Sequence, residues 1–74
     1  MNKQDRKEIC EIMNILSDAQ SRIESLGEQE QEKFDNLSEG LQQAERGQKM
    51  EDDASTINDI ANDLNDIIEA LQEL

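Results

Sequence analysis

The sequence has no histidine and only one cysteine, Cys10. The absence of histidine excludes His-based acid–base catalysis, Cys–His and Ser–His–Asp nucleophiles, and zinc sites that use imidazole. A single cysteine allows no intramolecular disulfide and no thiolate metal cluster. Carboxylates are the remaining candidate catalysts, and a pair of them needs a concave, dry pocket that this composition does not favour. We therefore expect no enzymatic activity, no catalytic residues, no cofactor and no metal site.

Proline, tryptophan and tyrosine are also missing, and Phe34 is the only aromatic residue. The apolar residues are mostly Ile, Leu, Ala and Met, a composition typical of helices. Their spacing is helical, which a disordered tail does not require. A chain of 74 residues is one small domain whose core supplies only about 3 to 5 kcal/mol. With disulfides and metals excluded, association of copies is the expected source of further stability.

Positive charge is scarce. Nineteen acidic and seven basic residues give a formal charge of −12, and no base follows Lys49. Such a charge repels nucleic acid and anionic lipid, so we expect no direct contact with either. The N-terminal stretch MNKQDRKEICEIMNIL is interrupted by acidic residues and resembles neither a signal peptide nor a membrane span. A cytoplasmic location is therefore expected.

Residues 3 to about 34 are predicted to form the first helix. Apolar residues recur there at intervals of three and four, which gives one apolar face: Ile9, Ile12, Met13, Leu16, Ala19, Ile23 and Leu26. After Leu26, Gly27 and Glu30 interrupt this apolar face, and Phe34 is the next apolar residue on it. Two interpretations of Gly27 remain open: a helix that projects past its partner, or a close approach of another backbone.

A second helix is predicted over residues 45 to about 73, with an unusually wide apolar face. The apolar positions are 50, 54, 57, 60, 61, 64, 67, 68, 71 and 74. The helix could begin near Ala44 and Glu45 or only at Met50. We favour the earlier start, with Gly47 in the first turn, because Glu45 suits the positive end of the helix dipole.

The connector, about residues 35 to 44, is predicted to be a structured corner. Asp35 and Asn36 end the first helix, and Ser38 followed by Glu39 can cap a short turn. Leu37 and Leu41 can fold back as hydrophobic plugs on the helix ends. A calcium loop starting at Asp35 is excluded, because Leu37 and Arg46 occupy positions that need oxygen ligands.

These elements predict an all-α fold: one domain, 1–74, made of an antiparallel, coiled-coil-like helical hairpin. The apolar face of the second helix is too wide for one neighbouring helix to cover. We therefore expect a homodimer that forms a four-helix bundle. The residues predicted to face one another are Ile57, Ile60, Leu64, Ile67 and Leu71 on the second helix and Ile9, Leu16 and Ile23 on the first.

Acidic residues follow the second helix at regular intervals. With Ile57 taken as heptad position a, four of them fall at c and Asp63 falls at g, which predicts one stripe along a flank: Asp52, Asp59, Asp63, Asp66 and Glu73. A solvated face is one explanation and a surface for a basic partner is the other. The second choice for a partner surface lies at the corner, at Asp35, Asn36, Glu39 and Glu45. Cys10, next to the apolar face, is expected to be a half-buried, inert thiol.

Residues 28 to 51, EQEQEKFDNLSEGLQQAERGQKME, resemble a family of short acidic proteins encoded by tailed phages and prophages. The common pattern of that family resembles E-Q-E-x-[FY]-D-N-[LM]-P-E-x-[LI]-Q-x-S-E-[RK]-G. This chain has Ser38 where the family tends to have Pro, and Ala44 where it tends to have Ser. The resemblance implies a mobile-element origin and a two-helix fold, and it supplies no catalytic or ligand-binding residues.

Two functions remain. In the first, which we favour, the protein is a binding protein that inhibits or regulates a host protein with a basic surface, such as a defence or nucleic-acid-processing enzyme. Imitation of DNA is one mechanism for such inhibition. In the second, it is an assembly module whose acidity serves only solubility. A stripe with one carboxylate per turn of ~5.4 Å is sparser than the phosphates of a DNA strand, ~3.4 Å apart. A dimer with two stripes comes closer to DNA.

Overall fold

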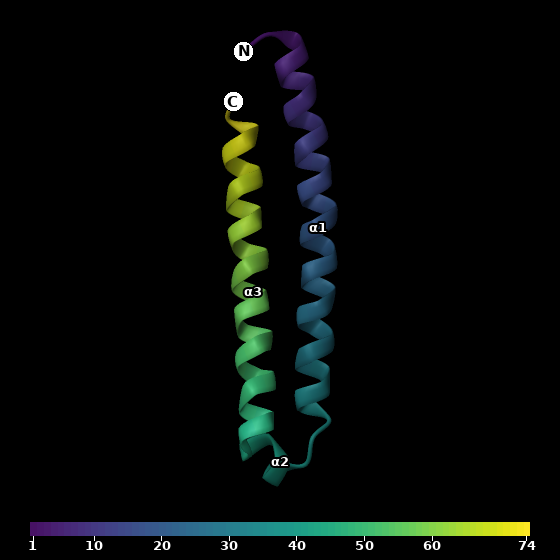
Figure 1. The fold of residues 1–74 in the computed structure, drawn as a ribbon, viewed down its shortest axis with the longest axis vertical. Coiled ribbons are helices and arrows are strands. Elements are labelled where there is room, and N and C mark those ends of the chain that lie inside the picture. The colour runs from purple at the N-terminus through teal and green to yellow at the C-terminus, as the bar shows by residue number, and fades with distance from the viewer.

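The protein folds as one long helical hairpin. A computed structural model describes all residues 1–74 and contains α1 (Lys3–Asp35), α2 (Glu39–Gln43) and α3 (Glu45–Gln72). The long helices α1 and α3 run antiparallel, and the two termini lie at one end of a rod that measures 58 × 15 × 12 Å between Cα atoms (Figure 1). None of the helices combines the length and the apolar character needed to cross a membrane. The predicted all-α antiparallel hairpin is confirmed.

The first helix begins with a reciprocal cap. The side chain of Asn2 accepts a hydrogen bond from the Asp5 backbone N–H at 2.8 Å, and the Asp5 carboxylate accepts one from the Asn2 N–H at 3.3 Å. Two amides that have no partner inside the helix are thereby satisfied. The helix then runs for 33 residues, about 50 Å, because no proline interrupts it.

The corner between the long helices is held by side-chain hydrogen bonds. Ser38 caps α2 by accepting a hydrogen bond from the Leu41 N–H, as predicted. Gln42 donates from Nε2 to the carbonyl oxygen of Phe34 at the end of α1, at 3.1 Å. Gln48 donates to the carbonyl oxygen of Gln42 at 3.0 Å, so that the start of α3 is tied to α2. The prediction of a structured corner is confirmed, and so is the earlier start of the second helix, at Glu45.

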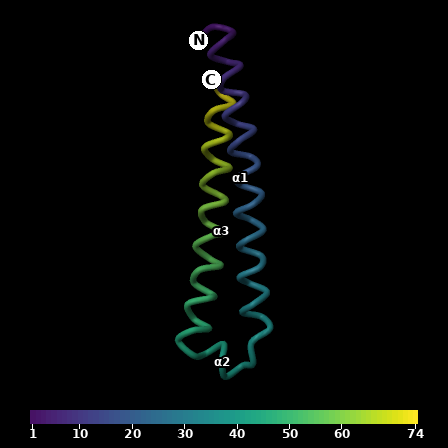
Figure 2. The backbone as a smooth tube through the Cα atoms, turned by 45° about the vertical axis from the view of Figure 1, so that its right-hand side comes forward, coloured from purple at the N-terminus to yellow at the C-terminus, as the bar shows by residue number.

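The two long helices meet along a single line of residues, here called the seam, and both views show them side by side (Figure 2). On α3 the seam contains three buried residues seven apart and four half-buried residues: Ala54, Ala61 and Ile68, and Met50, Ile57, Leu64 and Leu71. Gly47, seven residues before Ala54, is also buried, but against the backbone of α2. On α1 the seam consists of eight half-buried residues at alternating intervals of four and three: Ile9, Met13, Leu16, Gln20, Ile23, Gly27, Glu30 and Phe34. Such spacing keeps one narrow stripe of each helix facing the other. Two of the three buried α3 residues in the seam are alanines, so the seam buries few bulky side chains completely.

Polar contacts across the seam fix its register. Gln20 donates from Nε2 to the carbonyl oxygen of Ala61 at 3.2 Å, and Arg6 donates to that of Leu74 at 3.1 Å. A Cβ placed on Gly27 would lie 3.1 Å from Cγ2 of Ile57. Gly27 therefore packs in the seam against a side chain, and neither interpretation made from the sequence is right. The helix does not project past its partner here, and no backbone approaches Gly27.

Part of the predicted apolar contact lies outside the seam. Ile57, Leu64 and Leu71 are half-buried in the seam, whereas Ile60 and Ile67, which were predicted to face first helices within a four-helix bundle, are 44% and 49% exposed in the single chain. Each of the two lies one residue before a seam residue, Ala61 or Ile68, and is turned away from α1 of its own chain by about 100°. Leu41 differs from its prediction as a plug, because it is 56% exposed, whereas Leu37 is half-buried.

Gly47 is the residue on which the corner depends. A Cβ at this position would collide with the carbonyl oxygen of Leu41 and would lie 2.6 Å from that of Gln42. Both atoms belong to the backbone of α2, so they cannot move aside without moving the turn. A glycine is therefore required for α2 to lie against the first turn of α3. Gly40, on the exposed side of α2, has open space around it.

We expect the change Gly47→Ala to lower the free energy of unfolding by about 1 to 3 kcal/mol, because it forces the corner apart. For a chain of this size that corresponds to a fall of roughly 5 to 20 °C in Tm. The matched control is Gly40→Ala, which adds the same methyl group in open space and should leave Tm unchanged or slightly higher. Thermal denaturation followed by circular dichroism at equal concentration measures both. Equal Tm values for the two variants would contradict the role given to Gly47.

The start of α3 offers a second test, because Ala44 provides no side-chain cap. Its backbone, with φ −71° and ψ 160°, already has the extended conformation of an N-cap. We expect Ala44→Ser to raise stability by about 1 kcal/mol, or roughly 4 to 8 °C in Tm, by giving the first amides of α3 an acceptor. The reverse change at the other cap, Ser38→Ala, should lower Tm. An unchanged Tm in Ala44→Ser would show that these amides need no further acceptor.

Candidate functional site

The predicted acidic residues of α3 lie on its outer surface. Asp59 lies two residues after Ile57 and two before Ala61, so it points about 160 to 200° away from both of these seam residues. The same holds for the residues seven apart from it, and we call this set the acidic back of α3: Asp52, Asp59, Asp66 and Glu73. The sequence analysis placed them on a flank because it took Ile57 as position a. With the seam of the structure, they occupy the position farthest from α1, and all are exposed.

Asp63 differs from the other four. It is exposed, but it lies three residues after Ile60 and four before Ile67, on the side of α3 that carries those isoleucines. The second-choice residues gather near the corner and are also exposed: Asp35, Asn36, Glu39 and Glu45. The structure therefore separates the nine candidates into the acidic back, the lateral Asp63 and the corner.

These carboxylates are largely unpaired within the chain. The one salt bridge joins Lys49 to Asp53, with 2.6 Å between Nζ and Oδ1. The hydrogen bond and the charge of Asp53 raise the pKa of Lys49, with smaller contributions from Asp52 and Glu30. Because Lys49 is fully exposed, this pair adds little to stability. No member of the acidic back forms an ion pair, so the charge of this surface is available to a partner.

The sequence analysis overlooked a second acidic surface, on α1. Three exposed residues there lie midway between seam residues and so occupy the position opposite the seam: Glu11, Asp18 and Glu32. The signal was present in the sequence, since each lies two residues from a seam residue on either side. We call this set the acidic back of α1. The two backs point in opposite directions, so a single flat partner can contact only one of them.

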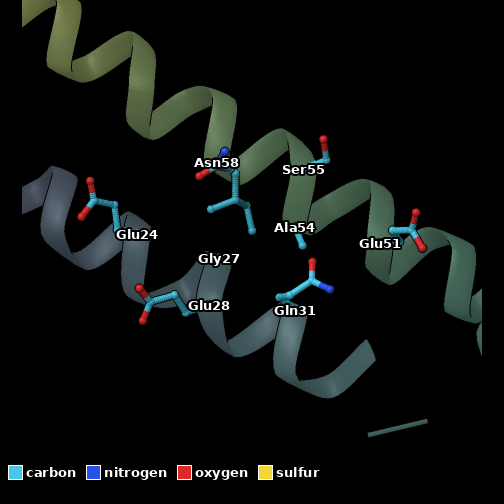
Figure 3. Close-up of a pocket in the computed structure, with 9 residues that line it drawn as sticks. Glu24, Gly27, Glu28, Gln31, Glu51, Ala54, Ser55 and Asn58 are labelled. Atoms are coloured by element: carbon cyan, nitrogen blue, oxygen red, sulfur yellow. The ribbon is translucent and has the colours of Figure 1, made fainter. Parts of the chain in front are cut away.

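An open groove of about 510 Å³ follows one side of the hairpin, toward the corner (Figure 3). Its floor contains Gly27 and Ala54, two small residues that leave space between the helices. Its rim carries three carboxylates, from Glu24 and Glu28 on α1 and Glu51 on α3. The groove is shallow and acidic, and it could accept a basic side chain.

Cys10 lies on the same side of the hairpin as this groove, and its thiol is exposed. The prediction of a half-buried thiol is wrong, because Cys10 follows the seam residue Ile9 by one position and is turned about 100° from the seam. No group of three or more Cys, Asp or Glu side chains gathers closely enough to hold a metal ion.

The opposite side of the hairpin is apolar and was not separated from the core by the sequence analysis. Six aliphatic side chains on it remain between 40% and 68% exposed: Ile12, Ile15, Leu26, Ile60, Ile67 and Leu74. Complete burial of an Ile or Leu stabilises by about 1.5 to 3 kcal/mol, so each of these forgoes roughly 1 kcal/mol in water. The hairpin by itself therefore leaves a contiguous aliphatic surface in water.

No protein-family model, curated protein or solved structure matches this chain.

Proposed function

We propose that this protein is a non-enzymatic binding protein that inhibits or regulates a host protein by placing the acidic back of α3 against a basic groove of its target. The resemblance of residues 28 to 51 to phage-encoded proteins supports a phage or other mobile element as the origin and the host cytoplasm as the place of action. A defence or nucleic-acid-processing enzyme is the kind of target that presents such a groove.

The observation that carries the proposal is the one-sided charge of α3. From Met50 to Leu74 the chain contains no Lys or Arg, and the acidic back is exposed and unpaired. Like charges on a helix are destabilising, so a surface kept only for solubility would gain from interspersed lysines. A rigid helix, in addition, holds its carboxylates at fixed spacing. That arrangement favours specific attraction of a basic surface and speeds association with it.

The spacing of the charges bears on the DNA-mimic mechanism. Residues of the acidic back of α3 are seven apart, or about 10.5 Å along the helix, so this stripe alone is sparser than the phosphates of one DNA strand. The whole rod carries twelve net negative charges over 58 Å, one per about 5 Å, compared with one per about 1.7 Å of duplex axis. A single hairpin therefore imitates the negative charge of DNA but not the positions of its individual phosphates.

A second function, that of an assembly module, is favoured by a different observation, the exposed apolar side described above. In that case the acidic backs would serve only to keep the rod in solution. The two proposals differ in which surface the target touches. They can be separated by neutralising one acidic back at a time.

We expect the variant D52N/D59N/D66N to keep its fold, with Tm unchanged or slightly raised, because it removes exposed like charges and leaves the seam intact. The same variant should capture its target from an extract of the host bacterium at least tenfold more weakly than the unmodified protein does at 50 mM NaCl. The loss should appear mainly as slower association, and the difference should shrink at 300 mM NaCl, where charges are screened.

The matched control is E11Q/D18N/E32Q, which removes the same number of charges from the acidic back of α1. It should bind almost as well as the unmodified protein. Duplex DNA added to the captured complex should release the target if the groove normally holds nucleic acid. Undiminished capture by D52N/D59N/D66N would refute the proposal and leave the corner residues or the assembly module as the explanation.

A further inference from the structure

The exposed aliphatic residues of both long helices lie on one and the same side of the hairpin. On α1, Ile12 and Leu26 each precede a seam residue by one position, and on α3, Ile60 and Ile67 do the same. When two helices pack antiparallel, the residue just before a seam residue points to the same side of the pair on both helices. Ile15 continues the stripe on α1, one turn after Ile12.

The opposite side confirms this geometry. Glu24 and Gln31 on α1 follow seam residues by one position, and so do Glu51 and Asn58 on α3. All four line the same groove (Figure 3). Residues that follow the seam therefore share the polar side. Those that precede it share the other side, which we call the apolar side: Ile12, Ile15, Ala19, Leu26, Ile60, Ile67 and Leu74.

The apolar side is limited to the half of the rod that contains the termini. The hydrogen bond from Arg6 to Leu74 and the contact of Gly27 with Ile57 show which residues of α1 and α3 lie at the same height along the rod. In this register the patch extends from Leu74 to Leu26. Leu26 adjoins Gly27, which meets Ile57, so the patch covers about 16 residues of α3, or about 24 Å along the helix axis. Nearer the corner, the same positions are charged, with Lys33 on α1 and Arg46 and Asp53 on α3. The patch therefore has a defined end.

The patch approaches the size that a specific dimer needs. Two helices packed about 10 Å apart give a face about 20 Å wide, so a patch about 24 Å long covers about 480 Å² per copy. Two such faces bury about 1,000 Å² in total, near the smallest area expected of a specific interface. Because the seam is already filled within one chain, this face is the part of the apolar surface that is free for a second copy.

Charges at the two edges of the patch are complementary between copies. Arg22, the only base between Lys7 and Lys33, lies beside the patch on α1, four residues before Leu26. Asp63 lies beside it on α3. The side chain of Gln20 donates a hydrogen bond to the carbonyl oxygen of Ala61. Arg22 and Asp63 each lie two residues further along their helices, so their heights along the rod differ by no more than about one helical turn. They occupy opposite edges of the hairpin, and no salt bridge joins them.

We propose that two copies of this chain pack through their apolar sides, with a twofold axis parallel to the rod. This symmetry places α1 of each copy against α3 of the other and brings Arg22 beside the partner's Asp63 at both edges. The alternative twofold axis, perpendicular to the rod, puts α3 against α3 and leaves Asp63 facing acidic or apolar residues. The resulting four-helix bundle leaves the acidic backs and the polar groove exposed, so the inference stands independently of the proposed function.

Sedimentation at 100 µM tests the proposal, with twice the chain mass of 8.5 kDa expected for the unmodified protein. The variant I60Q/I67Q should raise the dimer dissociation constant more than tenfold while circular dichroism still shows the helices, because both side chains are already half-exposed. The control N58Q/N65Q carries new glutamines on the polar side of the same helix and should remain a dimer. A folded monomer of the unmodified protein would overturn the proposal and assign the patch to a different protein.

Exchange of the edge charges tests the symmetry without touching the apolar residues. Each single change, Arg22→Asp or Asp63→Arg, should raise the dissociation constant severalfold at 50 mM NaCl, because like charges then face each other. The double variant R22D/D63R should restore it to within about twofold of the unmodified value. Failure of the double variant to restore dimerisation would overturn the axial arrangement, whatever the stability of the single variants.

Discussion

The contact between α1 and α3 along the seam is the interaction on which everything else in this protein depends. Each long helix carries many like charges and could hardly persist alone, since helices gain most of their stability from tertiary packing. The seam is narrow, and its fully buried residues are small except for Ile68. The helices therefore pack through small and half-buried side chains instead of through a bulky core. That solution suits a chain with one aromatic residue, but it leaves much of the aliphatic surface uncovered.

Because the hairpin is straight, the seam divides its surface into four sides with different chemistry. The two acidic backs point away from each other, the groove side is polar and acidic, and the remaining side is apolar over half its length. A twofold dimer through the apolar side would carry twenty-four net charges on one rod, or one per about 2.4 Å of its length. That density lies between those of single- and double-stranded DNA. The apolar and acidic surfaces would then serve one function together.

The corner shows how a short connector can be made rigid without large side chains. Gly47 lets the backbone of α2 lie directly on the first turn of α3, and Gln42 and Gln48 link the backbones of neighbouring elements. These contacts fix the start of α3 and, together with the polar contacts across the seam, set the register of the two long helices. The corner thus controls which residues of the apolar stripes meet, although it lies at the far end of the rod from most of the aliphatic residues (Figure 1).

The sequence by itself determined the helices, their antiparallel arrangement and the position of the corner, because these follow from local spacing, capping and the absence of proline. Asn36, Ser38 and Glu45 mark boundaries that need no distant partner. Only the tertiary structure decided which part of the apolar face on α3 is core. Ile57 and Ile60 both fit a helical apolar stripe, and the choice between them depends on the register with α1. The same register turned Cys10 outward, moved Asp59 from a flank to the back of α3, and separated Asp63 from the other acids. A periodic pattern fixes the angles between residues on one helix, but the direction that faces the other helix is set by packing across the pair.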